Sequence, residues 1–85
     1  MTDQHNRHDL PPGVIDAEPW NGIGNEFAGV RFRKVSTRNG ERLELYVPRT
    51  ESGILLDPMA LEVLADQQPE FFTRLIATRL GSADN

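Results

Sequence analysis

FAGVRFRKVSTRNGERLELYVP, residues 27–48, holds two runs of alternating apolar and polar residues on either side of Asn39-Gly40. Asn-Gly between such runs is the strongest short-range signal for a β-hairpin, because a type I′ turn needs positive φ at both central residues. A two-residue Asn39-Gly40 loop places Arg38 opposite Glu41, and the pairing then continues outward along both strands. The stretch therefore predicts one antiparallel hairpin.

The predicted register separates the hairpin into two faces, because side chains alternate across a strand. The apolar face carries Val30, Phe32, Leu43, Leu45 and Val47, with Lys34 as its one charge. The basic face carries Arg31, Arg33, Val35, Arg42, Glu44 and Tyr46. A three-residue loop with a bulge at Gly40 would slip the register by one residue and mix the two faces, so we favour the two-residue loop.

The residues after the hairpin predict a cover for its apolar face. Ile54-Leu55-Leu56 is a candidate third strand. Asp57 followed by Pro58 is a typical helix start, and the helix predicted over residues 58–67 aligns Leu61, Leu64 and Ala65. A second helix is predicted over residues 69–80, with Phe72, Leu75, Ile76 and Leu80 at helical spacing and Gly81 after them. This order predicts an α+β domain, residues 25–81: an antiparallel hairpin or three-stranded meander covered on one face by two short C-terminal helices.

Length and composition limit the possible classes of protein. The chain has 85 residues, no cysteine and a formal net charge of −4. It allows one small domain without disulfides or thiolate metal sites. No apolar run is long enough to span a membrane, and the first residues lack the apolar core of a signal peptide, so a cytoplasmic protein is expected. Residues 27–49 hold six bases and two acids, between acidic segments on both sides.

Residues 1–24 predict a flexible acidic tail, since they contain few aliphatic side chains and the pair Pro11-Pro12. Deleting residues 1–19 is accordingly expected to leave the domain folded. Residues 82–85 are expected to form a disordered C-terminus. Trp20 is the exception in the tail, and two interpretations of it stand. It is an anchor that docks on its own domain, or an anchor for a partner.

The sequence contains no convincing catalytic, cofactor-binding or metal site. Gly22-Ile23-Gly24 is followed by Phe27 where a dinucleotide fingerprint needs its third glycine. His5 and His8, with Asp3 and Asp9, are metal-ligand types, but they lie in the predicted tail. Both histidines are in that tail, which also argues against a Ser-His-acid triad. We therefore predict a chain without catalytic residues, bound cofactor or metal.

The candidate partner-binding residues are three aromatic residues and the three arginines of the basic face: Trp20, Arg31, Arg33, Arg42, Tyr46 and Phe71. Three interpretations of the basic face remain. It is a solvated polar face, a surface for an acidic protein segment such as the N-terminal tail of this chain, or a site for a phosphate backbone. Nucleic acid is the least favoured, because Tyr46 is the one aromatic on the face for stacking bases. Phe71 and Phe72 predict core packing, with an exposed Phe71 as the alternative.

Four segments of the chain carry a resemblance to a known group of proteins. They are Asn25-Glu26-Phe27-Ala28, VRFRKV at residues 30–35, TRNGERLE at residues 37–44 and LDPMALE at residues 56–62. Over about residues 25–80 the chain resembles small bacterial proteins labelled dihydrodiol dehydrogenase. The resemblance implies oxidation of aromatic cis-diols with a nicotinamide cofactor, or a role beside an oxidoreductase or oxygenase in the degradation of aromatic or related compounds.

These observations support hypotheses from different functional classes. The first is a non-catalytic accessory or protein-binding module associated with an oxidoreductase or oxygenase. The second is a dihydrodiol dehydrogenase-type enzyme or a subunit of one, and the third is a nucleic-acid-binding regulator. A folded part of about 60 residues buries only about 60% of the surface of its unfolded chain. We therefore expect a homodimer or a complex with a larger protein.

Overall fold

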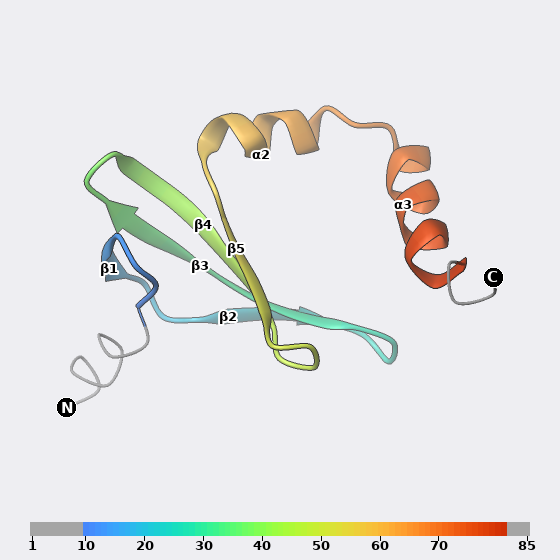
Figure 1. Cartoon of the computed structure of the whole chain (residues 1–85), viewed down its shortest axis with the longest axis horizontal. Coiled ribbons are helices and arrows are strands. Elements are labelled where there is room, and N and C mark those ends of the chain that lie inside the picture. The colour runs from blue at the N-terminus through green and yellow to red at the C-terminus, as the bar shows by residue number, and fades with distance from the viewer. Residues whose placement is uncertain (1–9, 82–85) are drawn as a thin grey trace.

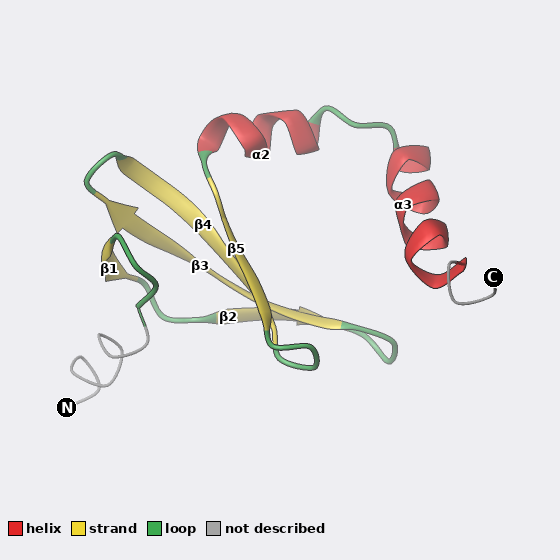
Figure 2. Cartoon of the chain, viewed as in Figure 1, coloured by secondary structure: helices red, strands yellow, loops and turns green. Residues whose placement is uncertain are grey.

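The computed structural model describes residues 10–81, and it confirms the α+β class. An antiparallel sheet of five strands is followed by two helices (Figures 1 and 2). The strands are β1 (Val14–Ala17), β2 (Asn21–Gly24), β3 (Gly29–Thr37), β4 (Gly40–Val47) and β5 (Ser52–Leu56), and the helices are α2 (Pro58–Ala65) and α3 (Pro69–Gly81). The order across the sheet is β1-β3-β4-β5, and β2 also pairs with β3.

The two helices begin where the sequence predicts them, at Pro58 and Pro69, whereas β5 begins at Ser52, two residues before the predicted strand. β5 pairs antiparallel with β4, which makes the predicted three-stranded meander. The Asp57 carboxylate accepts a hydrogen bond from the backbone N–H of Ala60 at 2.8 Å, and Pro58 occupies the first turn of α2. An aspartate at this position satisfies a backbone donor that the helix itself cannot, and proline has no N–H to leave unpaired.

The hairpin of β3 and β4 is present, but its register differs from the prediction by two residues. Thr37 is opposite Gly40, so the two-residue loop is Arg38-Asn39 rather than Asn39-Gly40. The Thr37 hydroxyl explains the difference, since it accepts from the Asn39 N–H at 3.1 Å and donates to the Gly40 carbonyl at 2.8 Å. Neither loop residue has positive φ, whereas Gly40 has φ +115°. A slip of two residues preserves the alternation, so both predicted faces have the predicted composition.

Gly40 is still the residue on which this turn depends. We expect Gly40→Val to lower the free energy of unfolding by about 1–3 kcal/mol, because a β-branched residue resists positive φ. An added Cβ would meet no atom closer than 3.6 Å, so the cost comes from the backbone and not from a clash. Thermal unfolding followed by circular dichroism measures it. Asn39→Val is the control, because Asn39 has no positive φ, and an equal loss in both variants would contradict the assignment.

The N-terminal segment differs most from the prediction. We predicted a tail over residues 1–24, but β1 and β2 both belong to the sheet and pair antiparallel with β3. Aliphatic side chains are scarce in this segment, and pairing of the backbone with β3 holds it in the sheet. Gly22 lies opposite Arg31, and Gly24 lies opposite Gly29. Residues 1–9 and 82–85, which include His5, His8 and the predicted disordered C-terminus, lie outside the described residues.

Two tight turns place these N-terminal strands. The Val14 N–H donates to the Pro11 carbonyl at 3.1 Å, and Gly13 has φ +88°. Proline followed by a glycine of positive φ is the signature of a type II turn. Between β2 and β3, the Asn25 side-chain oxygen accepts from the N–H groups of Phe27 and Ala28 at 2.8 and 2.9 Å. This turn leaves Phe27 80% exposed at the tip of the hairpin.

The core of the described residues is small and lies under the basic face, not the apolar one. Val14 and Val35 are its buried apolar side chains, and Arg33 is buried beside them. Of the predicted helical cover, α2 contacts β4, whereas α3 stands apart from the sheet in Figure 1. The radius of gyration is 15.1 Å, against about 12 Å for a compact chain of this length. The apolar side chains of the hairpin are half-buried, so the helices cover the apolar face of the sheet only in part.

Candidate protein-binding surfaces

Arg33 is the centre of the basic face. Its side chain is 2% exposed, and its Nε donates to the Glu44 carboxylate at 2.7 Å. The two residues are direct partners in the β3–β4 register. The Arg33 guanidinium also lies 4.0 Å from the centre of the Trp20 ring. A charge this deeply buried needs such partners, because transfer of an unpaired ion out of water is costly.

Trp20 docks on its own domain, which decides between the two interpretations given above. Its ring is half-buried and lies 6.3 Å from the Tyr46 ring, with the ring planes tilted by 49°. The indole therefore covers Arg33 and contacts Tyr46 from the connection between β1 and β2. The N-terminal part of the chain thus lies on the basic face through the Trp20 ring and not through an acidic side chain, so binding of an acidic segment there stays a prediction. A cation between an aromatic face and a carboxylate is a stable arrangement in a dry site.

The other two arginines of the basic face, Arg31 and Arg42, flank Arg33 in the β3–β4 register. Arg31 is exposed, whereas Arg42 is half-buried and donates to the neighbouring Glu41 carbonyl at 2.8 Å. Trp20, Arg31, Glu44 and Tyr46 line a hollow of about 350 Å³. The structure therefore brings together Trp20, Arg31, Arg33 and Tyr46, and it places Arg42 farther along the strand.

The other face of the sheet has its charges at one end. Lys34 lies 3.3 Å from the Glu41 carboxylate and 3.5 Å from that of Glu18. The hydrogen bond and the charge of Glu41, and then the charge of Glu18, raise the pKa of Lys34 above its ordinary value. All three groups are well exposed, so these pairs contribute little to stability. They neutralise the one cation of the apolar face.

Phe71 lies on α3 and is half-buried, away from the Trp20 cluster. Its ring packs edge-on against that of Phe72, with centroids 5.2 Å apart. Phe72 is the more exposed of the two, so it is the better candidate for contact with another molecule. The helical pattern alone does not distinguish Phe71 from Phe72, because it does not show which side of the helix has a partner.

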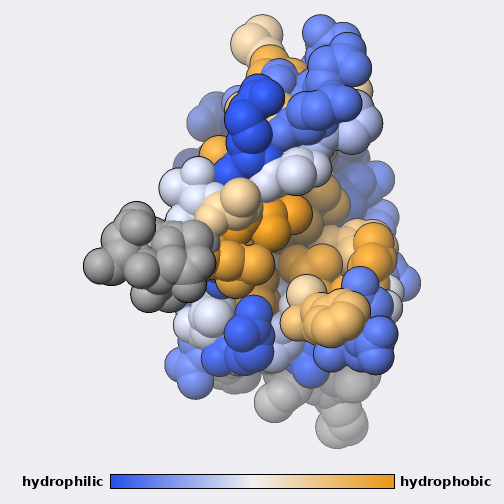
Figure 3. Space-filling view, turned by 90° about the vertical axis from the view of Figure 1, so that its right-hand side faces the viewer, coloured by the Kyte–Doolittle hydropathy of each residue, from blue (hydrophilic) through white to orange (hydrophobic). Residues whose placement is uncertain are grey.

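The two helices hold seven of the eleven large apolar side chains that are exposed in residues 10–81. They are Met59, Val63, Leu64, Phe72, Leu75, Ile76 and Leu80, each more than a third exposed. We call these residues the helical apolar surface. Of the predicted stripe on α2, Leu61 is half-buried, whereas Leu64 and Ala65 are exposed. Figure 3 shows apolar residues gathered in the middle of one side of the molecule, with polar residues above and below them.

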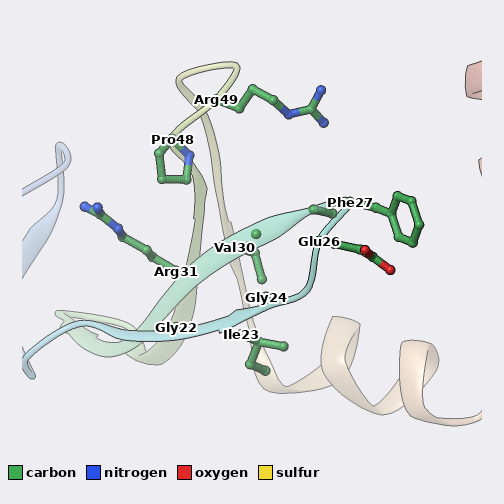
Figure 4. Close-up of a pocket in the computed structure, with 11 residues that line it drawn as sticks. Gly22, Ile23, Gly24, Glu26, Phe27, Val30, Arg31, Pro48 and Arg49 are labelled. Atoms are coloured by element: carbon green, nitrogen blue, oxygen red, sulfur yellow. The ribbon is translucent and has the colours of Figure 1, made fainter.

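A second hollow of about 500 Å³ lies beside the β2–β3 hairpin (Figure 4). Its lining includes the glycines of β2, Phe27, Arg31 and Arg49. In Figure 4 the guanidinium groups of Arg31 and Arg49 point away from one another, so they do not converge on one anion. Gly22 and Gly24 stand in a strand and not before a helix, which is unlike a phosphate-binding loop.

Residues 10–81 contain neither a metal-ligand cluster nor a membrane-spanning helix. No group of three histidine, cysteine, aspartate or glutamate side chains in this range is able to hold a metal ion. No helix in this range is both long and apolar enough to cross a membrane. Comparison of the chain with protein-family models, curated proteins and solved structures found no match.

Glu44, Phe72 and Phe27 are the candidate residues that the sequence analysis missed. Glu44 had a signal, because a carboxylate and an arginine on the same predicted face are potential partners. Phe27 had one as well, since Asn25 two residues earlier is typical of a turn. The exposure of Phe72 had no such signal, because it depends on where α3 lies relative to the sheet.

Proposed function

We propose that this chain is a non-catalytic accessory module that binds a larger protein through its helical apolar surface. The observation that carries the proposal is the exposure of seven large apolar side chains on α2 and α3. Large exposed apolar surfaces are rare on monomeric proteins and mark interaction sites. The resemblance described above names the class of partner, which is an oxidoreductase or oxygenase component for aromatic or related compounds.

The chemistry of the helical surface fits a protein partner. Phe72, Leu75 and Ile76 are apolar anchors on one side of α3, and helical spacing places Glu70 and Arg74 on the opposite side. Apolar and aromatic anchors of this kind dominate the binding energy of protein interfaces. The basic face is a poorer candidate for a partner, because Trp20 and the Arg33–Glu44 pair already fill its centre.

The test is affinity purification of the tagged chain from its native host, with mass spectrometry of the proteins that co-purify. Wild type is expected to retain one oxidoreductase or oxygenase component in a fixed ratio. Ile76→Glu is expected to reduce that recovery at least about tenfold, because it places a charge among the apolar anchors. Ile76 is 57% exposed, so the substitution is expected to leave the fold intact.

Thr78→Glu is the matched control, since it adds the same charge to the same helix. The Thr78 hydroxyl bonds the Arg74 carbonyl, and residues 76 and 78 lie on different sides of α3. Equal recovery with both variants would contradict the proposed surface. Reduction of NAD⁺ by the purified chain with an aromatic cis-diol would contradict the non-catalytic assignment.

A further inference from the structure

The two edges of the sheet are built differently. One edge is formed by β1 and β2, two strands of four residues each, with an irregular register between Val14 and Asp16 and a charge at Asp16. Short strands, bulges and charges are the devices that keep an edge from pairing with another chain. The other edge is β5, Ser-Gly-Ile-Leu-Leu, which contains no charge, proline or bulge. β5 is therefore the unprotected edge of the described sheet.

We propose that β5 pairs antiparallel with β5 of a second copy of this chain, about a two-fold axis at Ile54. In a symmetric antiparallel pair the axis is perpendicular to the sheet, so Ile54 lies opposite Ile54 of the second copy. Gly53 then lies opposite Leu55 of the second copy, and Leu55 opposite its Gly53. The pairing satisfies the outward backbone groups of both strands without burying a charge.

The shape of the strand supports pairing with itself. Tyr46 is the β4 partner of Gly53, and a Cβ added at Gly53 would lie 3.5 Å from the Tyr46 ring. The glycine thus leaves the outer edge of that ring open. Leu55 of the second copy, on the same face and in the next strand, is placed to pack against the ring above Gly53. Each copy supplies both the large and the small residue, so the fit is reciprocal.

Charges lie only at the ends of the proposed pair. Glu51 precedes β5 and Asp57 follows it, and pairing about Ile54 places each Glu51 opposite Asp57 of the second copy. The two copies also carry −4 each. Repulsion between them is screened by salt, so the dimer is expected to become tighter as the ionic strength rises. A dimer formed instead between the basic hairpin of one copy and an acidic segment of another would become weaker as the ionic strength rises.

The pairing joins two sheets into one of ten strands, with both apolar faces on the same side. It leaves α3 of each copy available, so the dimer presents two helical apolar surfaces to a larger protein. This inference goes beyond the proposed function and does not depend on it. A strand of five residues contributes less area than the 1,200–2,000 Å² of a standard interface, so the dissociation constant is expected at about 1–100 µM.

The test uses the purified full chain alone, so its failure leaves the proposed binding of a larger protein untouched. Sedimentation velocity from about 1 to about 500 µM is expected to show a species of 9.6 kDa that shifts toward twice that mass. Ile54→Lys is expected to remain monomeric throughout this range, because a charge on an edge strand prevents pairing. Ile23→Lys is the control, since Ile23 on the opposite edge is 65% exposed against 55% for Ile54, and this variant is expected to dimerise like wild type.

Cysteine cross-linking tests the register without depending on the Lys variants. The natural chain has no cysteine, so Ile54→Cys introduces its one thiol. Opposed Cα atoms about 4.5–5.5 Å apart are within disulfide range, and oxidation is expected to give a covalent dimer. Ile15→Cys on the opposite edge is the control. A monomer at about 500 µM, or cross-linking that is equal in the two variants, would overturn the proposal.

Discussion

Replacing Arg33 with methionine is expected to destabilise the protein by about 2–4 kcal/mol, and so to lower the midpoint of thermal unfolding by at least about 10 °C. The substitution keeps most of the apolar stem but removes the guanidinium that holds Glu44 and stacks on Trp20. Glu44 is only 12% exposed, so its carboxylate would be left with little water around it. Thermal unfolding followed by circular dichroism measures the loss.

The controls for this variant separate the buried pair from charge in general. Arg31→Met removes the same charge from the same strand at an exposed position, and a change of less than about 0.5 kcal/mol is expected. Arg33→Met combined with Glu44→Leu is expected to recover part of the loss, because no unpaired carboxylate is then buried. Equal stability of the Arg33→Met and Arg31→Met variants would show that the buried pair does not stabilise the fold.

Deleting residues 1–19 is expected to abolish cooperative unfolding, which reverses the expectation drawn from the sequence alone. The deletion removes β1 and its ladder with β3, and it removes Val14 from a core in which Val35 is its buried apolar neighbour. The loss of one buried valine and several ladder hydrogen bonds amounts to about 3 kcal/mol or more. That is a large part of the stability available to a domain of this size.

Deleting residues 1–9 is the matched control for the shorter chain, since it leaves every strand of the described sheet in place. This variant is expected to unfold with a single sharp transition in circular dichroism. The longer deletion is expected to give a broad change without a defined midpoint. A sharp transition at the wild-type temperature after deletion of residues 1–19 would mean that β1 contributes nothing to the fold.

The two faces of the hairpin were predictable although its exact register was not. A register slip by an even number of residues keeps each side chain on its face of the sheet, whereas an odd slip moves it to the other face. The pattern of apolar residues excludes the odd slip, because that slip would mix the two faces. The choice between even registers depends on the turn. There the side-chain hydrogen bonds of Thr37 outweigh the preference of Asn39-Gly40 for a type I′ turn. Residue types alone do not show which of these two preferences prevails.

The N-terminal strands carried a signal that composition concealed. Pro12-Gly13 before Val14 and Ile15 is a recognisable type II turn, but scarce aliphatic residues suggested a tail instead. Pairing with β3 and the contact of the Trp20 ring with the Arg33 guanidinium stabilise these strands. Both interactions join segments that are distant in sequence. The position of α3 was unpredictable for a related reason, since helical periodicity identifies an apolar stripe without identifying what covers it.

The strand order has a consequence for how the chain folds. β2–β3, β3–β4 and β4–β5 are each formed by neighbours in sequence, whereas β1–β3 closes across the intervening β2. Closing a longer loop costs more entropy, so the meander is able to form rapidly and β1 is the last strand to join. β1 has four residues and lies at an edge of the sheet, so its amide hydrogens are expected to exchange before those of the central strands β3 and β4.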